Sequence, residues 1–194
     1  MNTSGTTSWR TLRRTADLPE VPWANGRGTT VELISPDESS LFYSRSFPVD
    51  GRWRLSVASL DEPGPYSRLP DKDRVHVPLA GIGLTVDGEL HTIPAYTPFT
   101  FDGGARTELT VLPVPTRAVN LVVDRDSPAA GRLDIRVVDA GTPVPNALAA
   151  VALDGSDDLL VPYVPDVGEV RISAADTRLV AVVWKPWASS GTEK

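Results

Sequence analysis

The chain has 194 residues, a formal net charge of −6 and no cysteine, and these properties exclude several functional classes. The acidic balance disfavours binding to the phosphates of nucleic acids. The lack of cysteine excludes disulfides, thiolate metal sites and cysteine nucleophiles. No apolar run approaches the roughly 20 residues that a membrane span requires, and the polar start lacks a signal-peptide pattern. The composition therefore predicts a soluble cytoplasmic protein with no nucleic-acid or membrane partner.

Proline and glycine divide the chain into short segments rich in β-branched residues, a pattern typical of strands. The 18 prolines and 15 glycines are spread along the chain and leave little room for long helices. Two hairpin turns are expected, at residues 48–51 and at Asp87-Gly88. The predicted strands, in chain order, are 41–47, 52–60, 83–86, 89–93, 108–112, 118–123, 132–138, 159–164, 169–172 and 178–184.

Many short strands separated by turn residues favour an all-β sandwich, jelly roll or barrel. Asp, Ser, Pro and Gly cluster just after residue 123, which indicates a join between two units. We expect a disordered tail at 1–8, an N-terminal barrel at 9–124, a smaller C-terminal barrel at 125–188 and a second tail at 189–194. No sequence repeat relates the two units.

Residues 23–32 form the first candidate site, because two glycines lie near an asparagine and a pair of threonines. Such a segment can form a backbone nest for a carboxylate or phosphate. A phosphate-binding loop would continue into Lys-Ser/Thr and a helix, whereas this chain continues into an apolar stretch. The alternative is a turn that leads into a strand, with Asn and Gly tolerating a positive φ. The candidate ligand-binding residues are Asn25, Gly26, Gly28, Thr29, Thr30 and Glu32.

The strand predicted at 52–60 carries the second candidate site on one of its faces. Its two sets of alternating residues are Trp53, Leu55 and Val57, and Arg54, Ser56 and Ala58. A strand places such sets on opposite faces. If the apolar set packs in a core, Arg54 and Ser56 line a barrel interior that suits an anion. The alternative is a sheet surface on which Arg54 forms a weak ion pair.

A third stretch, residues 64–74, is predicted as a long loop because it combines two prolines with several charges. Loops carry functional residues more often than regular strands do. We interpret Asp73 and Arg74 as an ion pair that orders this loop, rather than as part of a site.

Metal and nucleophilic chemistry have little support in the sequence. The only histidines are His76 and His91, and the residue two positions after His76 is Pro78. The closely spaced histidine pair of a cupin metal site is therefore missing, and we expect no metal and no cofactor. No Gly-x-Ser-x-Gly motif is present.

Taken together and in order, these stretches resemble the HutD/Ves family. That family has a Trp-x-Asn-Gly-Gly-Gly-x-Thr-type opening, a Trp-Arg-Leu-Ser-x-Ala strand and a Gly-Pro-Phe-Ser-x-Phe-Pro-Gly-x-Asp-Arg loop. This chain has residues 23–30, 53–58 and 64–74 at those places, and Phe101-Asp102 and Asn120 match a fourth segment. The resemblance extends over residues 9–125. The departures from the family pattern are Arg27, Val31, Tyr66, Leu69, Asp71 and Ala118.

The resemblance implies a bicupin fold, with two cupin-type β-barrels or jelly rolls, a metal-free pocket and a link to histidine utilisation or its regulation. We expect the ligand to be an acidic metabolite such as formiminoglutamate. Its carboxylate would pair with Arg54, and Asn25 and the Gly26 and Gly28 backbone would donate further hydrogen bonds. The pocket residues expected with the resemblance added are Asn25, Arg54 and Ser56, joined by Thr29, Thr30 and Asn120. His76 is a further candidate ligand-binding residue.

Two alternatives remain open beside this binding protein. One is a metal-independent cupin isomerase or hydrolase with His76 or Glu32 as its base. The other is a structural or oligomerisation module without a ligand; a homodimer is compatible with the sequence. Turnover favours the enzyme, whereas thermal stabilisation by a metabolite without turnover favours the binding protein.

Overall fold

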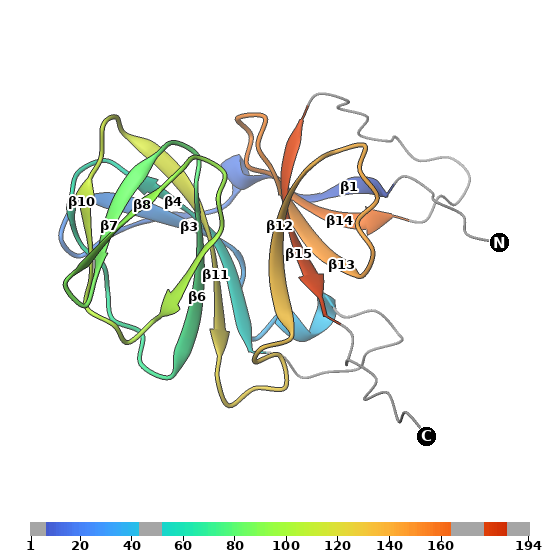
Figure 1. Ribbon diagram of the computed structural model, residues 1–194. Coiled ribbons are helices and arrows are strands. Elements are labelled where there is room, and N and C mark those ends of the chain that lie inside the picture. The colour runs from blue at the N-terminus through green and yellow to red at the C-terminus, as the bar shows by residue number, and fades with distance from the viewer. Residues whose placement is uncertain (1–6, 43–51, 164–176, 186–194) are drawn as a thin grey trace, which may run out of the picture.

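The computed structural model describes residues 7–42, 52–163 and 177–185, which form three β-sheets and two short 3-10 helices (Figure 1). No helix among these residues is long and apolar enough to cross a membrane. The all-β prediction is confirmed. The strands are β1 (Ser8–Arg13), β2 (Glu20–Pro22), β3 (Gly28–Ile34), β4 (Trp53–Leu60), β5 (Gly64–Pro65), β6 (Lys72–Pro78), β7 (Ile82–Val86), β8 (Glu89–Ile93), β9 (Phe99–Asp102), β10 (Thr107–Val111), β11 (Thr116–Asp124), β12 (Leu133–Asp139), β13 (Ala147–Ala152), β14 (Leu159–Tyr163) and β15 (Arg178–Trp184). The 3-10 helices are η1 (Thr15–Asp17) and η2 (Ser39–Phe42).

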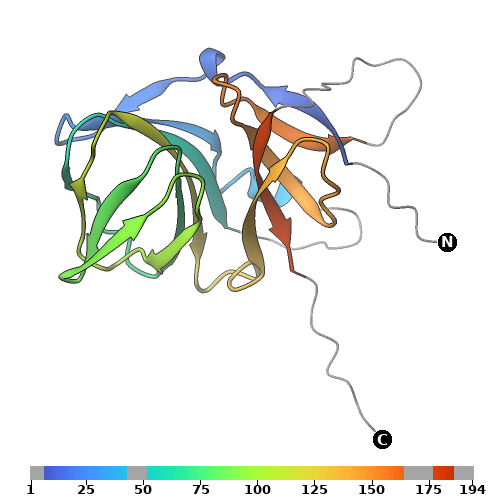
Figure 2. The same ribbon diagram turned by 45° about the horizontal axis from the view of Figure 1, so that its top comes forward.

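Two antiparallel sheets form a cupin-like jelly roll in the N-terminal part of the chain. The strand order is β2-β3-β4-β11-β6-β9 in the six-stranded sheet and β5-β10-β7-β8 in the four-stranded sheet. Figure 1 and Figure 2 show these sheets as opposite walls of a rounded body. The walls are separate sheets and do not close into a continuous barrel.

The remaining described strands form a five-stranded sheet with the order β1-β14-β13-β15-β12. The first strand of the chain therefore pairs with a strand of the C-terminal part, with Trp9 opposite Pro162. Ser8, expected in a tail, is the first residue of β1. Trp9 is 3% exposed and packs with Leu160 and Ala150, so β1 is held by apolar burial as well as by its backbone hydrogen bonds.

The largest apolar core lies between the six-stranded and the five-stranded sheets. Trp53, Leu55 and Val57 of β4 enter it from one side, and Val180 and Val182 of β15 from the other. Fully burying a side chain of this size stabilises the fold by roughly 1.5–3 kcal/mol. This confirms that the apolar set of β4 packs between sheets, so the alternating set turns toward the interior of the jelly roll.

The predicted hairpin at Asp87-Gly88 is confirmed, and it joins β7 to β8. Asp87 has φ 47° and Gly88 has φ 93°. Two consecutive residues with positive φ are the requirement of the two-residue turn whose twist matches that of the flanking strands.

Two predicted strands have a different outcome. Of the strand expected at 41–47, Leu41 and Phe42 end the 3-10 helix η2, and the other residues lie outside the described part of the chain. The strand expected at 169–172 also lies outside it. The strands expected at 89–93 and 178–184 coincide with β8 and β15.

The core between the sheets gives a direct stability prediction. Leu121 of β11 is 0% exposed in that core, whereas Leu90 of β8 is 58% exposed. We expect Leu121→Ala to lower the free energy of unfolding by about 2–5 kcal/mol, because it removes buried contacts and leaves a cavity. Leu90→Ala should change it by less than about 0.5 kcal/mol. Urea denaturation measures the free energy of unfolding of both variants. Equal losses for the two variants would contradict the burial of Leu121 in this core.

Candidate functional site

The jelly roll contains a cavity of about 680 Å³. Sites for small molecules typically measure roughly 300–1,000 Å³. The six-stranded sheet forms the floor of the cavity, and two segments around residues 19–25 and 65–69 surround its mouth. The polar residues that the floor contributes are Thr30, Glu32, Arg54, Ser56, Arg74, His76 and Asn120.

The register of the six-stranded sheet aligns four of these polar side chains in one row. Glu32 of β3 lies opposite Ser56 of β4, Ser56 opposite Asn120 of β11, and Asn120 opposite His76 of β6. Residues directly opposite each other project from the same face of a sheet. A polar row therefore crosses four strands inside the jelly roll.

Two arginines form the next row, on either side of Val122. Val122 of β11 pairs with Arg54 on β4 and with Arg74 on β6. Each arginine is two residues before a member of the polar row, Ser56 or His76, and so faces the same cavity. The floor thus carries two guanidinium groups beside a row of hydrogen-bonding side chains.

Arg74 is a cation held by aromatic rings rather than by a carboxylate. Its guanidinium carbon lies 5.3 Å from the ring centre of Tyr66 and 5.1 Å from that of Phe101, within the range of cation–π interactions. Its Nη1 donates to the carbonyl of Ser67 at 3.4 Å. None of the ion pairs among the described residues involves Arg74. Burial lowers its pKa to about 10, and the charge of Arg54 acts in the same direction, so Arg74 remains protonated at neutral pH.

Arg54 differs from Arg74 because it has a carboxylate neighbour. Its Nε lies 3.8 Å from Oε2 of Glu32, and these side chains are 36% and 44% exposed. An ion pair this exposed contributes about 0–1 kcal/mol. The guanidinium is therefore only partly neutralised and still faces the cavity.

His76 lies at the far end of the polar row and is 1% exposed. Its Nδ1 is 2.8 Å from Oδ1 of Asn120, and its ring centre is 5.7 Å from that of Tyr66. Burial lowers the pKa of His76 to about 4; the charge of Arg74 acts in the same direction, and the bond to Asn120 opposes both. The ring is therefore neutral at pH 7.

Several buried polar atoms that line the cavity have no hydrogen-bond partner. They are Arg54 Nε, Ser56 Oγ, Tyr66 Oη, Arg74 Nε and His76 Nε2. A buried polar group without a partner costs about 1–3 kcal/mol. Burial also raises the pKa of the Tyr66 phenol, which stays a neutral donor. Together these atoms supply several donors and one ring acceptor to a polar anion.

The segment at residues 23–28 forms a tight turn at the mouth. The backbone nitrogen of Gly26 donates to the carbonyl of Trp23 at 2.9 Å, and Gly26 has φ 68°. The Asn25 side chain accepts from the backbone of Arg27 at 3.1 Å and donates to the carbonyl of Pro65 at 3.2 Å. Asn25 thus ties this turn to the second segment at the mouth.

Three sequence-predicted site residues do not line the cavity. Gly28 begins β3 so close to Ser59 that a Cβ on it would lie 2.2 Å from the Ser59 carbonyl oxygen. Gly26 supports the turn, and Thr29 donates to the Glu20 carboxylate. The predicted residues that do line the cavity are Asn25, Thr30, Glu32, Arg54, Ser56, His76 and Asn120.

The interpretation of Asp73 and Arg74 as an ion pair is wrong. They are neighbours on β6, so their side chains project from opposite faces. Asp73 pairs with Arg125, at 2.8 Å between Oδ1 and Nη2, and Arg74 enters the cavity. Neither Arg74 nor Tyr66 was among the site residues predicted from the sequence.

Metal ligands are not gathered in the described residues, which contain no group of three or more His, Asp or Glu side chains that could hold a metal ion. His91 lies on β8 with its ring 4.9 Å from that of Phe99, and it is not part of the cavity lining.

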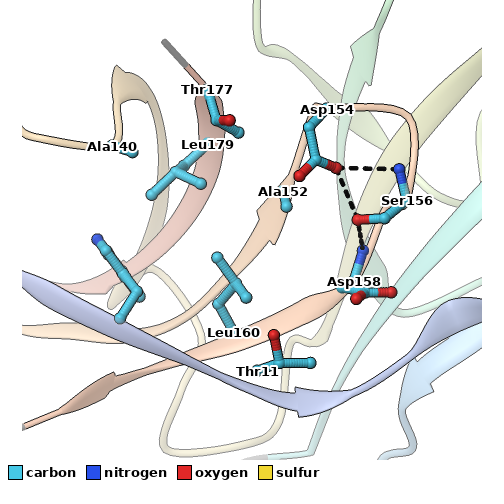
Figure 3. A pocket seen from close by; sticks show the side chains of 10 residues that line it. Thr11, Ala140, Ala152, Asp154, Ser156, Asp158, Leu160, Thr177 and Leu179 are labelled. Atoms are coloured by element: carbon cyan, nitrogen blue, oxygen red, sulfur yellow. Dashed lines mark hydrogen bonds between the residues drawn. The ribbon is translucent and has the colours of Figure 1, made fainter. Parts of the chain in front are cut away.

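A second cavity lies at the five-stranded sheet, but it has the size of a single water molecule, about 30 Å³. Figure 3 shows Leu160 and Leu179 on one side and one acidic loop on the other. Within this loop Asp154 accepts from the Ser156 hydroxyl at 2.6 Å, and Ser156 accepts from the backbone of Asp158 at 3.2 Å. These side chains already satisfy one another, and a metabolite would not fit.

Comparison with known proteins shows the family and the fold. The HutD family model matches residues 15–156. The uncharacterized 21.2 kDa protein in the hutC 3′ region of Pseudomonas putida is 32% identical over 57% of this chain and 56% of its own length. Protein Ves of Cronobacter sakazakii is 35% identical over 48% of this chain and 51% of its own length. The chain thus spans about half of the length of these curated relatives.

Solved structures share the fold over nearly the whole chain. HutD from Pseudomonas fluorescens SBW25 has a TM-score of 0.59 at 22% identity, covering 92% of this chain and 100% of its own. A conserved protein of unknown function from Pseudomonas aeruginosa PAO1 has a TM-score of 0.61 at 21% identity, covering 91% and 98%. These likenesses show that the cupin-like arrangement of sheets is a shared architecture.

The buried His76 predicts a specific dependence of stability on pH. The pKa of His76 is about 4 in the folded state against 6.5 ordinarily. Above pH 6.5 the ring is neutral in both the folded and the unfolded state, so its burial causes no loss in the free energy of unfolding there. Between pH 6.5 and pH 4 only the unfolded state binds the proton, which lowers the free energy of unfolding by up to about 3 kcal/mol. Urea denaturation from pH 7 to pH 4 should therefore show a larger loss in the wild type than in His76→Gln. His91→Gln is the matched control and should follow the wild type; parallel curves for all three proteins would contradict the burial of a neutral His76.

Proposed function

Because the chain belongs to the HutD family, we propose that it binds a small acidic metabolite, such as formiminoglutamate, with a regulatory role in histidine utilisation. The observation that carries the proposal is Arg74, a cation in the cavity floor that no carboxylate of the described residues pairs. A desolvated charge is costly unless it is compensated. A ligand carboxylate supplies the missing negative charge.

The chemistry of the floor suits a carboxylate better than a neutral ligand. Arg74 and Arg54 lie on either side of Val122 and repel each other, whereas Glu32 neutralises Arg54 only partly. An anion between the two guanidinium groups relieves this repulsion and accepts charge-assisted hydrogen bonds from both. Ser56 and Tyr66 add neutral donors, so the binding needs no metal ion.

The link to histidine utilisation comes from the relatives. The matching Pseudomonas putida protein is described by its position in the hutC 3′ region, and the Pseudomonas fluorescens structure is described as HutD. Formiminoglutamate joins two carboxylates to an N–H-bearing group, which matches the cations and the acceptor of the cavity floor.

An isomerase or hydrolase is the second candidate, favoured by the unpartnered Nε2 of His76. A general base works best when its pKa is near the working pH, and the pKa of His76 is about 4. Nε2 is therefore better suited to accepting a hydrogen bond than to removing a proton. Incubation with formiminoglutamate, glutamate or urocanate should stabilise the protein thermally without product formation; product would establish the enzyme instead.

Substitution of Arg74 tests the proposed anion site. We expect Arg74→Met, which keeps an apolar stem over the Tyr66 ring, to weaken formiminoglutamate binding by about 2–5 kcal/mol in a calorimetric titration. Arg54→Ala should cost less, because Glu32 already neutralises part of its charge. The control is Arg136→Ala on the exposed side of β12, which should bind as the wild type does. If Arg74→Met has an unchanged melting temperature and an unchanged affinity for formiminoglutamate, the ligand carboxylate does not bind at Arg74 and the proposed anion site is wrong.

A further inference from the structure

The hydrogen-bonding character of His76 follows from its neighbour Asn120. Nδ2 of Asn120 lies 3.4 Å from the carbonyl oxygen of Ala118, and Oδ1 lies 2.8 Å from Nδ1 of His76. A backbone carbonyl can only accept a hydrogen bond, so it requires the NH₂ group of Asn120 on its side. Rotating the Asn120 amide by 180° would place its oxygen beside the carbonyl oxygen of Ala118, and neither could donate a hydrogen bond. The strand β11 itself thus orients the amide, with its oxygen toward the ring.

The amide oxygen in turn determines which ring nitrogen carries the proton. An oxygen accepts only, so Nδ1 of His76 must donate, and the neutral ring then has a bare lone pair at Nε2. Nε2 is buried in the cavity lining and has no partner. Among the unpartnered atoms of the cavity lining, Nε2 is therefore the one that can only accept a hydrogen bond.

We propose that His76 and Asn120 form a donor-reading subsite, in which Nε2 of His76 accepts a hydrogen bond from an N–H group of the ligand and selects amino-acid derivatives over simple carboxylic acids. The inference rests on the proposed function, because it concerns the same cavity. It adds a selectivity that the cationic floor alone would not have.

The position of His76 relative to Arg74 sets the spacing that this subsite recognises. The two residues are separated by one position on β6 and project from the same face, with their Cα atoms about 7 Å apart. If the ligand carboxylate lies at Arg74, the ligand group that reaches His76 is only a few bonds away from that carboxylate. Free and N-substituted amino acids carry an N–H at this distance from a carboxylate.

Three probes built on the same five-carbon dicarboxylate test the selectivity. Glutamate and formiminoglutamate carry N–H groups, whereas glutarate has both carboxylates and no nitrogen. We expect calorimetric titration at pH 7 to give an affinity for glutarate at least about tenfold below that for the other two, since a site built to hydrogen-bond a donor rejects the analogue that lacks it. Net charge acts in the opposite direction: glutarate is the more negative probe, and the two arginines alone would favour it.

Asn120→Asp converts the acceptor into a donor with little change in volume. A carboxylate 2.8 Å from Nδ1 favours the imidazolium form, which carries a proton on Nε2 as well. Arg74 opposes this charge and Tyr66 is neutral, but the new carboxylate is the nearest group to the ring. We expect the preference for glutamate over glutarate to disappear or reverse.

His76→Phe removes the acceptor and keeps a ring of similar size, with His91→Phe as the matched control outside the cavity. We expect His76→Phe to lose the preference and His91→Phe to retain it. If His76→Phe does not fold, the near-isosteric Asn120→Asp still tests whether the preference for glutamate over glutarate depends on this subsite.

The outcomes separate the two proposals. Equal binding of glutamate and glutarate by the wild type would overturn the donor-reading subsite and leave the anion site standing. A wild-type preference that persists in folded Asn120→Asp would overturn it too. If none of the three acids binds, the proposed function fails, and the subsite fails with it.

Discussion

The apolar core between the six-stranded and the five-stranded sheets determines which side chains reach the cavity. Trp53, Leu55 and Val57 are committed to that core, and a strand cannot turn them inward without turning their neighbours outward. The alternation of the strand therefore makes Arg54 and Ser56 face the interior of the jelly roll. The same alternation on β11 and β6 brings Asn120 and His76 into line with them. The five-stranded sheet, although remote from the cavity, thus holds the site in register.

The cavity floor is costly to the fold, which is the reason to connect it with function. A sheet buried on both faces would gain most stability from apolar residues on both, yet this one keeps two guanidinium groups and a polar row with the unpartnered atoms Ser56 Oγ and His76 Nε2 on its inner face. Sequences that fold well depart from local consistency chiefly at functional sites. Under the proposed function a bound acid would complete the missing hydrogen bonds and balance the charge, so binding and stability should be linked.

Much of the fold could be predicted because its signals are local. The Asp87-Gly88 turn and the alternation of β4 follow from backbone geometry. Strands β6 and β13 were missed for physical reasons. On β6 the period-two alternation is present, with Val75 and Val77 alternating with Arg74 and His76, but the prolines and charges of residues 64–74 favoured a loop instead. Strand β13 is rich in alanine, a residue depleted in strands.

The candidate site was predictable only in part. The strand alternation singled out Arg54 and Ser56 without any knowledge of the neighbouring strands. Arg74 was not recognised, because its role depends on Tyr66 and Phe101, which only the fold brings to it. The acceptor character of His76 depends in the same way on an amide 44 positions further along the chain. Long-range pairing of this kind leaves no local signal.

The crystal structure of the protein with formiminoglutamate would test the central claim most directly, because that claim concerns where each group of the ligand lies. The account predicts a ligand carboxylate within hydrogen-bonding distance of the Arg74 guanidinium and a ligand N–H within hydrogen-bonding distance of Nε2 of His76. A ligand bound outside the jelly roll, or one with a carboxylate oxygen against Nε2 of His76, would contradict it.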